Sequence, residues 1–364
     1  MDGLSVGCKA AGDCLSSSCW KGMKCEFNGI FIIRDKHLNR VQKKRLAWRS
    51  GFFLLFILAP PLDIFRFDLN LNHFILFGFP WTLGMEAFQQ GDIGSEEMGL
   101  NMLLRFFLPL ASVLVAGIYI SWKWGRLYCG WLCPHFSVVE MINALMRRAS
   151  GKVTIWDRDR LPDSQLDGTH IEPERKWWGV TIVAVLFFSF LWAVALLTYL
   201  LPPKEIYGNL FGASLTRNQF IFISVGTILL TIEFTFARHL FCRFGCALGL
   251  FQSLVWMGNK KAMVVAYDRK RAKACIACDN SCEHACPVRL KPRSIKRRMF
   301  TCTQCMQCIE ACEDVQRNAS GLPLLKMLED QCALDVSERD FGYKPDVPNG
   351  CFALENRDKK KCCH

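Results

Sequence analysis

The stretch CTQCMQCIEAC, residues 302–312, places four cysteines within eleven residues. An earlier stretch, CIACDNSCEHACP at residues 275–287, contains four more. Bacterial two-cluster ferredoxins repeat the spacing C-x2-C-x2-C-x3-C-P, and the fourth cysteine of each run ligates the cluster of the other run. The two stretches therefore predict a small α+β ferredoxin domain of the bacterial type, with two [4Fe-4S] clusters as cofactors.

This ligation rule sorts the eight cysteines into two sets. The first ferredoxin set is Cys275, Cys278, Cys282 and Cys312. The second ferredoxin set is Cys302, Cys305, Cys308 and Cys286. The first run has one extra residue between Cys278 and Cys282, and Glu313 stands in place of the second proline. Paired CxxC units also form structural zinc sites, but the density of both runs favours iron–sulfur chemistry.

Outward from these runs, the chain contains four long apolar segments, and 51% of its 364 residues are hydrophobic. The segments are residues 46–65, 103–122, 178–201 and 219–236. A helix needs about 20 apolar residues to cross the hydrocarbon core of a bilayer, and the third segment is uncharged throughout. We therefore predict an α-helical integral membrane protein with about four transmembrane helices. Buried core helices are the alternative for the other three segments.

The charges of the connecting loops predict the orientation. Residues 67–104 carry five acidic side chains and no Lys or Arg, whereas residues 123–176 carry nine Lys or Arg and residues 238–298 carry fourteen. Basic loops stay in the cytoplasm, so both termini and the ferredoxin domain are expected there, in a bacterial inner membrane. Topology and attraction to the anionic lipid bilayer explain the net charge of +12 better than a nucleic-acid partner.

Two further cysteine pairs form an internal repeat. GRLYCGWLCPHFSVVE, residues 125–140, follows the second apolar segment, and RHLFCRFGCALGLFQS, residues 238–253, follows the fourth. Cysteines four residues apart share one face of a helix, so the pairs are predicted to meet as a candidate catalytic or terminal site. They would hold a soft metal ion, copper included, or form a redox-active dithiol; small buried residues are the alternative. The four residues are Cys129, Cys133, Cys242 and Cys246.

His135 and His239 flank the pairs and are weaker candidates for metal ligands. Glu233, near the end of the fourth segment, is a functional candidate because intramembrane acids usually are, although Arg238 offers an ion pair. The predicted domains are residues 1–45 (cytoplasmic segment), 46–258 (membrane domain), 259–320 (ferredoxin) and 321–364 (cytoplasmic tail). Eight cysteines receive no role: Cys8, Cys14, Cys19, Cys25, Cys332, Cys351, Cys362 and Cys363.

The order of these motifs resembles a known family. YCGWLCP follows one span, a second CxxxC follows a later span, and FQSLVWMGNKKAMVVAYD leads into two ferredoxin runs that end in CIEACEDV. Over residues 46–315 this arrangement resembles the CcoG (FixG, RdxA) proteins, within a wider group that includes NapH and NosR. The chain lacks the immunoglobulin-like domain that follows the ferredoxin in CcoG proteins. The resemblance implies a membrane iron–sulfur protein that reduces Cu(II) to Cu(I) during cytochrome oxidase assembly.

The resulting hypothesis is electron transfer from a cytoplasmic donor, through two clusters, to a metal or redox partner at the membrane. Basic residues near the clusters, Arg289, Lys291 and Arg293, would guide an acidic donor. The protein is then a cupric reductase that acts with oxidase-assembly partners, or a NapH-like subunit between the quinone pool and a respiratory partner enzyme. The competing hypothesis is a metal chaperone or sensor without redox chemistry.

Overall fold

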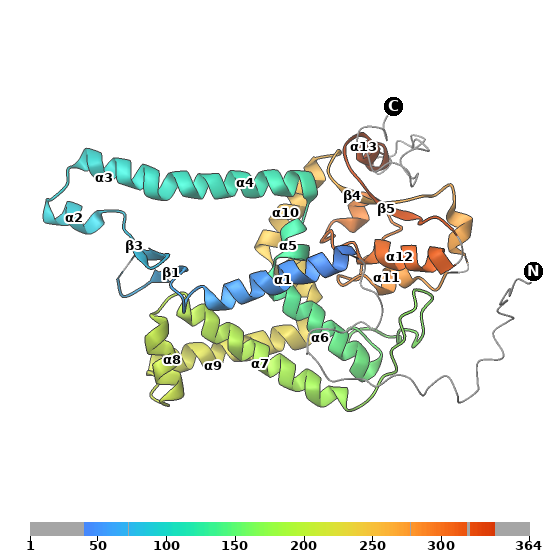
Figure 1. Cartoon of the computed structure of the whole chain (residues 1–364), viewed down its shortest axis with the longest axis horizontal. Coiled ribbons are helices and arrows are strands. Elements are labelled where there is room, and N and C mark those ends of the chain that lie inside the picture. Colours follow the sequence, from blue (N-terminus) through green and yellow to red (C-terminus); the bar gives the residue numbers. More distant parts are fainter. Residues whose placement is uncertain (1–39, 72, 277, 319–320, 339–364) are drawn as a thin grey trace, which may run out of the picture. The chain divides into compact units, whose positions relative to one another are not determined.

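The computed structural model describes residues 40–71, 73–276, 278–318 and 321–338 (Figure 1). Most of the described chain is helical, with two small antiparallel sheets. Seven of the cysteines without a predicted role lie outside these ranges: Cys8, Cys14, Cys19, Cys25, Cys351, Cys362 and Cys363.

Three helical stretches of the described residues are long and apolar enough to cross a membrane. The first runs through α3 (Ser95–Met102), the π-helical turn η1 (Leu103–Phe107) and α4 (Leu108–Trp124), which lie in line in Figure 1. The second is α7 (Trp177–Thr198), and the third is α9 (Arg217–Ile232) with its continuation η2 (Glu233–Ala237). Many of their large apolar side chains are exposed to the surroundings, as expected for helices that face lipid.

The segment expected to form the first of four spans behaves differently. It lies in α1 (Arg40–Leu58), whose first turns read RVQKKR. These polar turns pack against protein, because Gln42 and Arg45 are buried there, whereas Leu54 and Leu55 are exposed in the apolar half. Pro60 and Pro61 follow within three residues and end the helix, because proline cannot continue the ladder of backbone hydrogen bonds. The described residues therefore contain three candidate spans rather than four.

The acidic segment between α1 and the first span folds as a small sheet. Its strands are β1 (Phe65–Asp68), β2 (His73–Leu76) and β3 (Phe79–Trp81), paired antiparallel in that order. The short helix α2 (Met85–Gln90) follows. The backbone N–H of Phe67 donates to Tyr199 O at the end of α7, over 2.9 Å, so the sheet is attached to the end of that span.

Of the candidate spans, α7 packs against α9, and it also contacts α6 (Pro134–Ser150). At one α7–α9 contact, a Cβ added to Gly226 would lie 3.2 Å from the Cβ of Ala193. This close approach of backbones is how small residues drive helix association in membranes. The connecting helix α8 (Pro203–Phe211) lies between α7 and α9 in the chain, and α10 (Ala247–Gly258) packs against α4.

The cysteine-rich part forms an α+β unit. Strand β4 (Val264–Tyr267) pairs antiparallel with β5 (Leu325–Leu328), with Val264 opposite Leu328. Its short helices are η4 (Ala272–Cys275), α11 (Ser281–His284), η5 (Lys296–Met299), α12 (Gln307–Asn318) and α13 (Asp330–Glu338). One buried apolar core joins residues of α6 and α7 to both ferredoxin sets, so this unit and the membrane helices share their interior.

Candidate functional site

The first ferredoxin set lines one small cavity. Tyr267 and Arg293 lie on the wall of this cavity together with the cysteines. Its four thiols belong to η4, the loop after η4, α11 and α12: Cys275, Cys278, Cys282 and Cys312. The structure thus brings the fourth cysteine of the second run to the first run, as the spacing predicts.

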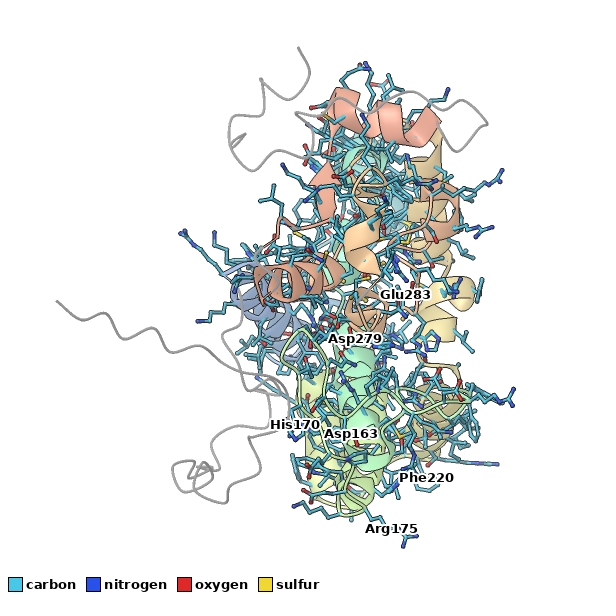
Figure 2. All side chains as sticks on the ribbon, turned by 90° about the vertical axis from the view of Figure 1, so that its right-hand side faces the viewer. Asp163, His170, Arg175, Phe220, Asp279 and Glu283 are labelled. Atoms are coloured by element: carbon cyan, nitrogen blue, oxygen red, sulfur yellow. The ribbon has the colours of Figure 1, made fainter. Side chains whose placement is uncertain are left out.

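The extra residue in the first run is absorbed by a left-handed turn. Asn280, just before α11, has φ 63°, a conformation that asparagine adopts more readily than most residues. Asp279 stabilises this turn, because its Oδ1 accepts from the backbone N–H of Ser281 at 3.0 Å and its Oδ2 accepts from the N–H of Leu166 at 2.9 Å. Figure 2 shows Asp279 between Glu283 and the loop that carries Asp163 and His170.

The second ferredoxin set is more deeply buried, because none of its four cysteines is more than 9% exposed. Burial raises the pKa of the Cys308 thiol, and the neighbouring Cys305, Cys286 and Cys302 raise it further. Gln304 and Met306, with φ of 54° and 62°, turn the chain so that the loop wraps around its thiols. The four predicted ligands of this cluster are therefore also neighbours.

The two CxxxC pairs do not each lie on one continuous helix, contrary to the expectation from their spacing. Cys129 lies in the short helix α5 (Leu127–Trp131), and Cys133 precedes the first residue of α6. The second repeat copies this break, with Cys242 in the turn η3 (Phe241–Gly245) and Cys246 just before α10. Each pair therefore spans a junction between a short helical turn and the start of a longer helix.

The two pairs nevertheless meet, and each contacts the other repeat. The Cys129 thiol donates to Gln252 Oε1 of α10 at 3.3 Å, and the sulfur of Cys242 lies 3.6 Å from Nδ1 of His135 in α6. Burial raises the pKa of the Cys133 thiol to about 11, and Cys129 and Cys246 are among the groups that raise it. We call this group of Cys129, Cys133, Cys242 and Cys246 the paired-cysteine site.

The flanking acid and histidines are placed differently from expectation. Glu233 pairs with His135, whose Nε2 lies 3.0 Å from Glu233 Oε2, and the backbone N–H of Arg238 donates to Glu233 O at 2.8 Å. His239 lies among Arg289, Arg238 and Asp157, and burial together with the two arginines lowers its pKa to about 4. His135 is thus the histidine beside the paired-cysteine site, and His239 is a neutral side chain in a basic environment.

The paired-cysteine site is pressed against the second ferredoxin run. A Cβ added to Gly130 would lie 2.0 Å from the carbonyl oxygen of Thr303, so only glycine fits between Cys129 and that loop. Trp131 Nε1 donates to Gln304 O at 3.1 Å. Two segments predicted to carry separate redox centres are therefore in direct backbone contact.

A buried polar clamp that the sequence analysis did not single out supports this junction. Glu140 of α6 accepts from Arg45 at 2.7 Å and also binds Arg49 and Gln307. Although burial acts to raise the pKa of Glu140, the two arginines outweigh it and hold the pKa at about 2. Arg45 also donates through Nε to Gly130 O at 2.7 Å. The available sequence signal was position: Glu140 is the last residue of the first repeat, and Arg45 immediately precedes the first apolar segment.

The donor sets fit iron–sulfur clusters. Buried thiols whose pKa is raised do not remain thiolates unless a metal replaces the proton, and the four thiols of the first set line one common cavity. Among the described residues, no three Cys, His, Asp or Glu side chains lie close enough to share one metal ion. Thiols that ligate a cubane bind different irons, so they stand farther apart than the ligands of a single zinc or copper ion.

A comparison with protein families indicates the class of protein to which the cysteine-containing membrane segments belong. A family described as "4Fe-4S binding domain" matches residues 104–152 and 218–263. Each match covers most of a candidate span and one CxxxC pair, whereas both ferredoxin runs lie outside the matched residues. The chain is therefore an iron–sulfur protein with apolar, membrane-type helices.

Three individual proteins are similar to parts of this chain. The chain is 26% identical over 210 residues to YccM of Escherichia coli K12, whose name assigns it to electron transport, covering 55% of this chain and 52% of YccM. It is 29% identical over 171 residues to the regulatory protein NosR of Stutzerimonas stutzeri, covering 44% of this chain and 20% of NosR. It is 25% identical over 232 residues to the ferredoxin-type protein NapH of Escherichia coli K12, covering 60% of this chain and 71% of NapH.

The chain thus spans about half the length of YccM and a fifth of NosR. No solved structure matches. The chain is related to the wider group of NapH, NosR and YccM, and two of its segments match a 4Fe-4S binding family. A specific likeness to CcoG, and with it copper, is not shown by these matches.

Proposed function

We propose that the protein is a membrane electron relay that works as a NapH-like subunit beside a respiratory partner enzyme. Electrons pass one at a time between the first ferredoxin cluster, the second ferredoxin cluster and the paired-cysteine site, and then to the partner. Each step oxidises one centre and reduces the next by one electron, so no proton or group moves with it. The observation that carries this proposal is the backbone contact between Gly130 and Thr303.

The exposure of the two sets supports the order. Cys275 and Cys278 are only partly buried, and Ile276 between them is 83% exposed. The first cluster is therefore the one that a soluble cytoplasmic donor reaches. The second set is enclosed and contacts the membrane repeats, so it passes electrons onward rather than exchanging them with solvent.

The charge of the loops supports the orientation, with the ferredoxin unit and the CxxxC pairs on the cytoplasmic side of a bacterial inner membrane. Residues 238–298 carry fourteen Lys or Arg, and basic loops are retained there. The finer CcoG-like function, reduction of Cu(II) to Cu(I) in oxidase assembly, uses the same relay with copper as its substrate. It requires that Cu(II) take an electron from the reduced clusters.

The test uses the full chain, purified without oxygen in detergent and reduced stoichiometrically with dithionite. Cluster absorbance and EPR are followed after addition of a soluble quinone or of Cu(II). Reoxidation by quinone and not by Cu(II) supports the NapH-like function, and stoichiometric formation of Cu(I) supports the copper reductase instead. Clusters that neither oxidant reoxidises, or zinc in place of iron, would overturn electron transfer and favour a metal chaperone or sensor.

The matched variants separate the terminal site from the clusters. Cys129→Ser with Cys242→Ser is expected to leave the two ferredoxin clusters reducible but to slow their reoxidation by the acceptor at least tenfold. Arg158→Gln, at an exposed position, serves as the control and should reoxidise at the wild-type rate.

A further inference from the structure

We propose that the paired-cysteine site holds a third cubane iron–sulfur cluster, shared between the two repeats, with the buried Arg126 as its countercharge. This inference rests on the relay proposed above and names the cofactor at its membrane end. The family match covers each repeat separately. Each repeat supplies only two thiols, however, and a cubane takes four cysteine ligands. One cluster between the repeats satisfies both pairs.

Arg126 is a buried cation that no carboxylate of the described residues neutralises. Arg126 is 1% exposed, and its Nη2 donates to the carbonyl oxygen of Cys242. Within the part of the chain that the structure describes, its Nε and Nη1 have no oxygen acceptor and no carboxylate pairs with it, and the neighbouring acidic group is the Cys129 thiol. A buried guanidinium that lacks an anion is strongly unfavourable. The site must therefore contain negative charge when it is assembled.

The position of Arg126 indicates where that charge lies. Its charge acts on Cys129, on Cys242 and on Cys302, so the guanidinium lies between both cysteine pairs and the second ferredoxin run. A cubane with four thiolate ligands carries net negative charge in both of its redox states, because the thiolates and sulfides outweigh the irons. Arg126 would stabilise the more negative, reduced state in particular.

The backbone makes room for this arginine. A Cβ added to Gly249 of α10 would lie 2.1 Å from Arg126 Nη2. The glycine therefore leaves the space that the guanidinium fills, and any larger residue would displace it. Since Arg126 comes from the first repeat and Gly249 from the second, the arrangement locks the two repeats around one shared site.

The helix junctions provide further donors for a negative group. The sulfur of Cys133 accepts from the backbone N–H groups of His135 and Phe136 in the first turn of α6. Helix N-termini favour anions, since their N–H groups lack partners in the helix. Cys246 has the equivalent position before α10. The break in each CxxxC pair, which the spacing did not predict, thus places the second cysteine of each pair at a helix N-terminus, which favours its thiolate form.

A single copper or zinc ion fits less well. Such an ion draws its ligands to within about 2.3 Å of itself, and no three suitable side chains of the described residues are that close together. Among the described residues, the two ferredoxin sets likewise contain no three side chains close enough to share one ion. In the relay, the third cluster is reduced by one electron as the second ferredoxin cluster is oxidised by one.

Counting iron in the anaerobic full chain tests the proposal directly. The wild type is expected to contain about twelve irons and as many sulfides per chain, rather than the roughly eight of two cubanes. The double variant Cys129→Ser, Cys242→Ser should lose about four irons and keep the EPR signals of the two ferredoxin clusters. About eight irons in both proteins would overturn the third cluster while leaving the two-cluster relay intact. Eight irons with one copper or zinc would also overturn it.

The role of Arg126 has its own readout. Removing a positive charge beside a cluster disfavours reduction, so Arg126→Gln should lower the midpoint potential of one cluster and leave the other two unchanged. Arg126→Lys, which keeps the charge, should restore most of that potential, and Arg158→Gln should shift none. Equal potentials in the wild type and in Arg126→Gln, at full iron content, would remove Arg126 from the proposal.

Discussion

The ferredoxin runs and the CxxxC repeats show two ways to gather four cysteines. In the ferredoxin unit, three ligands of each set come from one short loop, and the crossing fourth ligand follows from the motif. In the membrane repeats, each junction between a short helical turn and a longer helix supplies two cysteines. The two pairs meet through tertiary packing of the helices, including the contacts of α7 with α6 and α9. Local spacing is thus sufficient to specify the first kind of site, whereas the second kind depends on tertiary structure and on a buried arginine.

The largest expected effect tests whether the two kinds of site depend on each other. Cys308→Ser removes a fully buried ligand of the second ferredoxin set. Because cluster binding supplies folding energy and this run contacts Gly130, we expect loss of that cluster and of electron delivery to the membrane. Iron analysis and EPR measure the loss. Cys246→Ser is the matched control and should spare both ferredoxin clusters; equal losses in the two variants would contradict this dependence.

The next largest effect concerns the clamp at the junction. Glu140→Gln leaves Arg45 and Arg49 buried without their carboxylate, which typically costs about 3–5 kcal/mol. The thermal midpoint in detergent should fall by several degrees and the second ferredoxin cluster should become labile. Glu172→Gln, at an exposed carboxylate, is the control and should leave both unchanged. A wild-type midpoint in Glu140→Gln would show that the clamp does not hold the junction.

The same carboxylate predicts a pH dependence. The pKa of Glu140 is about 2 in the folded protein, against an ordinary value of 4.5. A depressed folded pKa contributes stability above the unfolded pKa, and this stability is lost as pH falls from about 4.5 toward 2. Wild-type protein should therefore lose about 3 kcal/mol across that window, and Glu140→Gln should lose less. Parallel melting curves between pH 5 and pH 3 would contradict this assignment.

A smaller effect is expected from the glycine at the contact. Gly130→Ala places a Cβ against Thr303 O, and overpacking of this kind costs about 1–3 kcal/mol. Separation of the two segments should also slow electron transfer between them, which stopped-flow reduction measures. Gly117→Ala is the matched control, because a Cβ there meets nothing within 4 Å. Identical kinetics in both variants would remove the Gly130 contact from the relay.

The smallest expected effect concerns the single hydrogen bond from Trp131 to the second ferredoxin run. Trp131→Phe removes the N–H that donates to Gln304 O at 3.1 Å, which is expected to cost about 1 kcal/mol. The cluster content should stay at the wild-type level while the thermal midpoint falls slightly. A loss of iron in this variant would mean that the loop around the second set depends on Trp131 far more than one hydrogen bond allows.

Much of this arrangement could be predicted from cysteine spacing and charge. Local patterns predict the two ferredoxin sets, the repeat and three of the four spans. The structure brings the cysteines of each predicted set together. The ligation itself stays a prediction. The predicted ferredoxin domain ends at residue 320, whereas strand β5, which pairs with β4, lies beyond that boundary. The sequence does not mark which segment pairs with a given strand.

What the sequence did not reveal depends on distant contacts. Helical periodicity put each CxxxC pair on one helix, whereas the chain breaks there so that Cys133 and Cys246 can precede new helices. Sequence patterns assign no role to Arg126 or Glu140, and only their burial and partners distinguish them. The first apolar segment is not among the three candidate spans: the polar first turns of α1, which precede it, are buried against the junction.

The shared core described above has a consequence for biogenesis. The thiols of the second ferredoxin set lie beneath residues of α6 and beside the loop against Gly130, so nothing large can reach them once the membrane helices have closed over them. A scaffold protein that delivers preformed clusters must therefore act during membrane insertion, before the helices have packed together. Iron supply during synthesis, rather than later repair, would then set how much functional protein a cell contains.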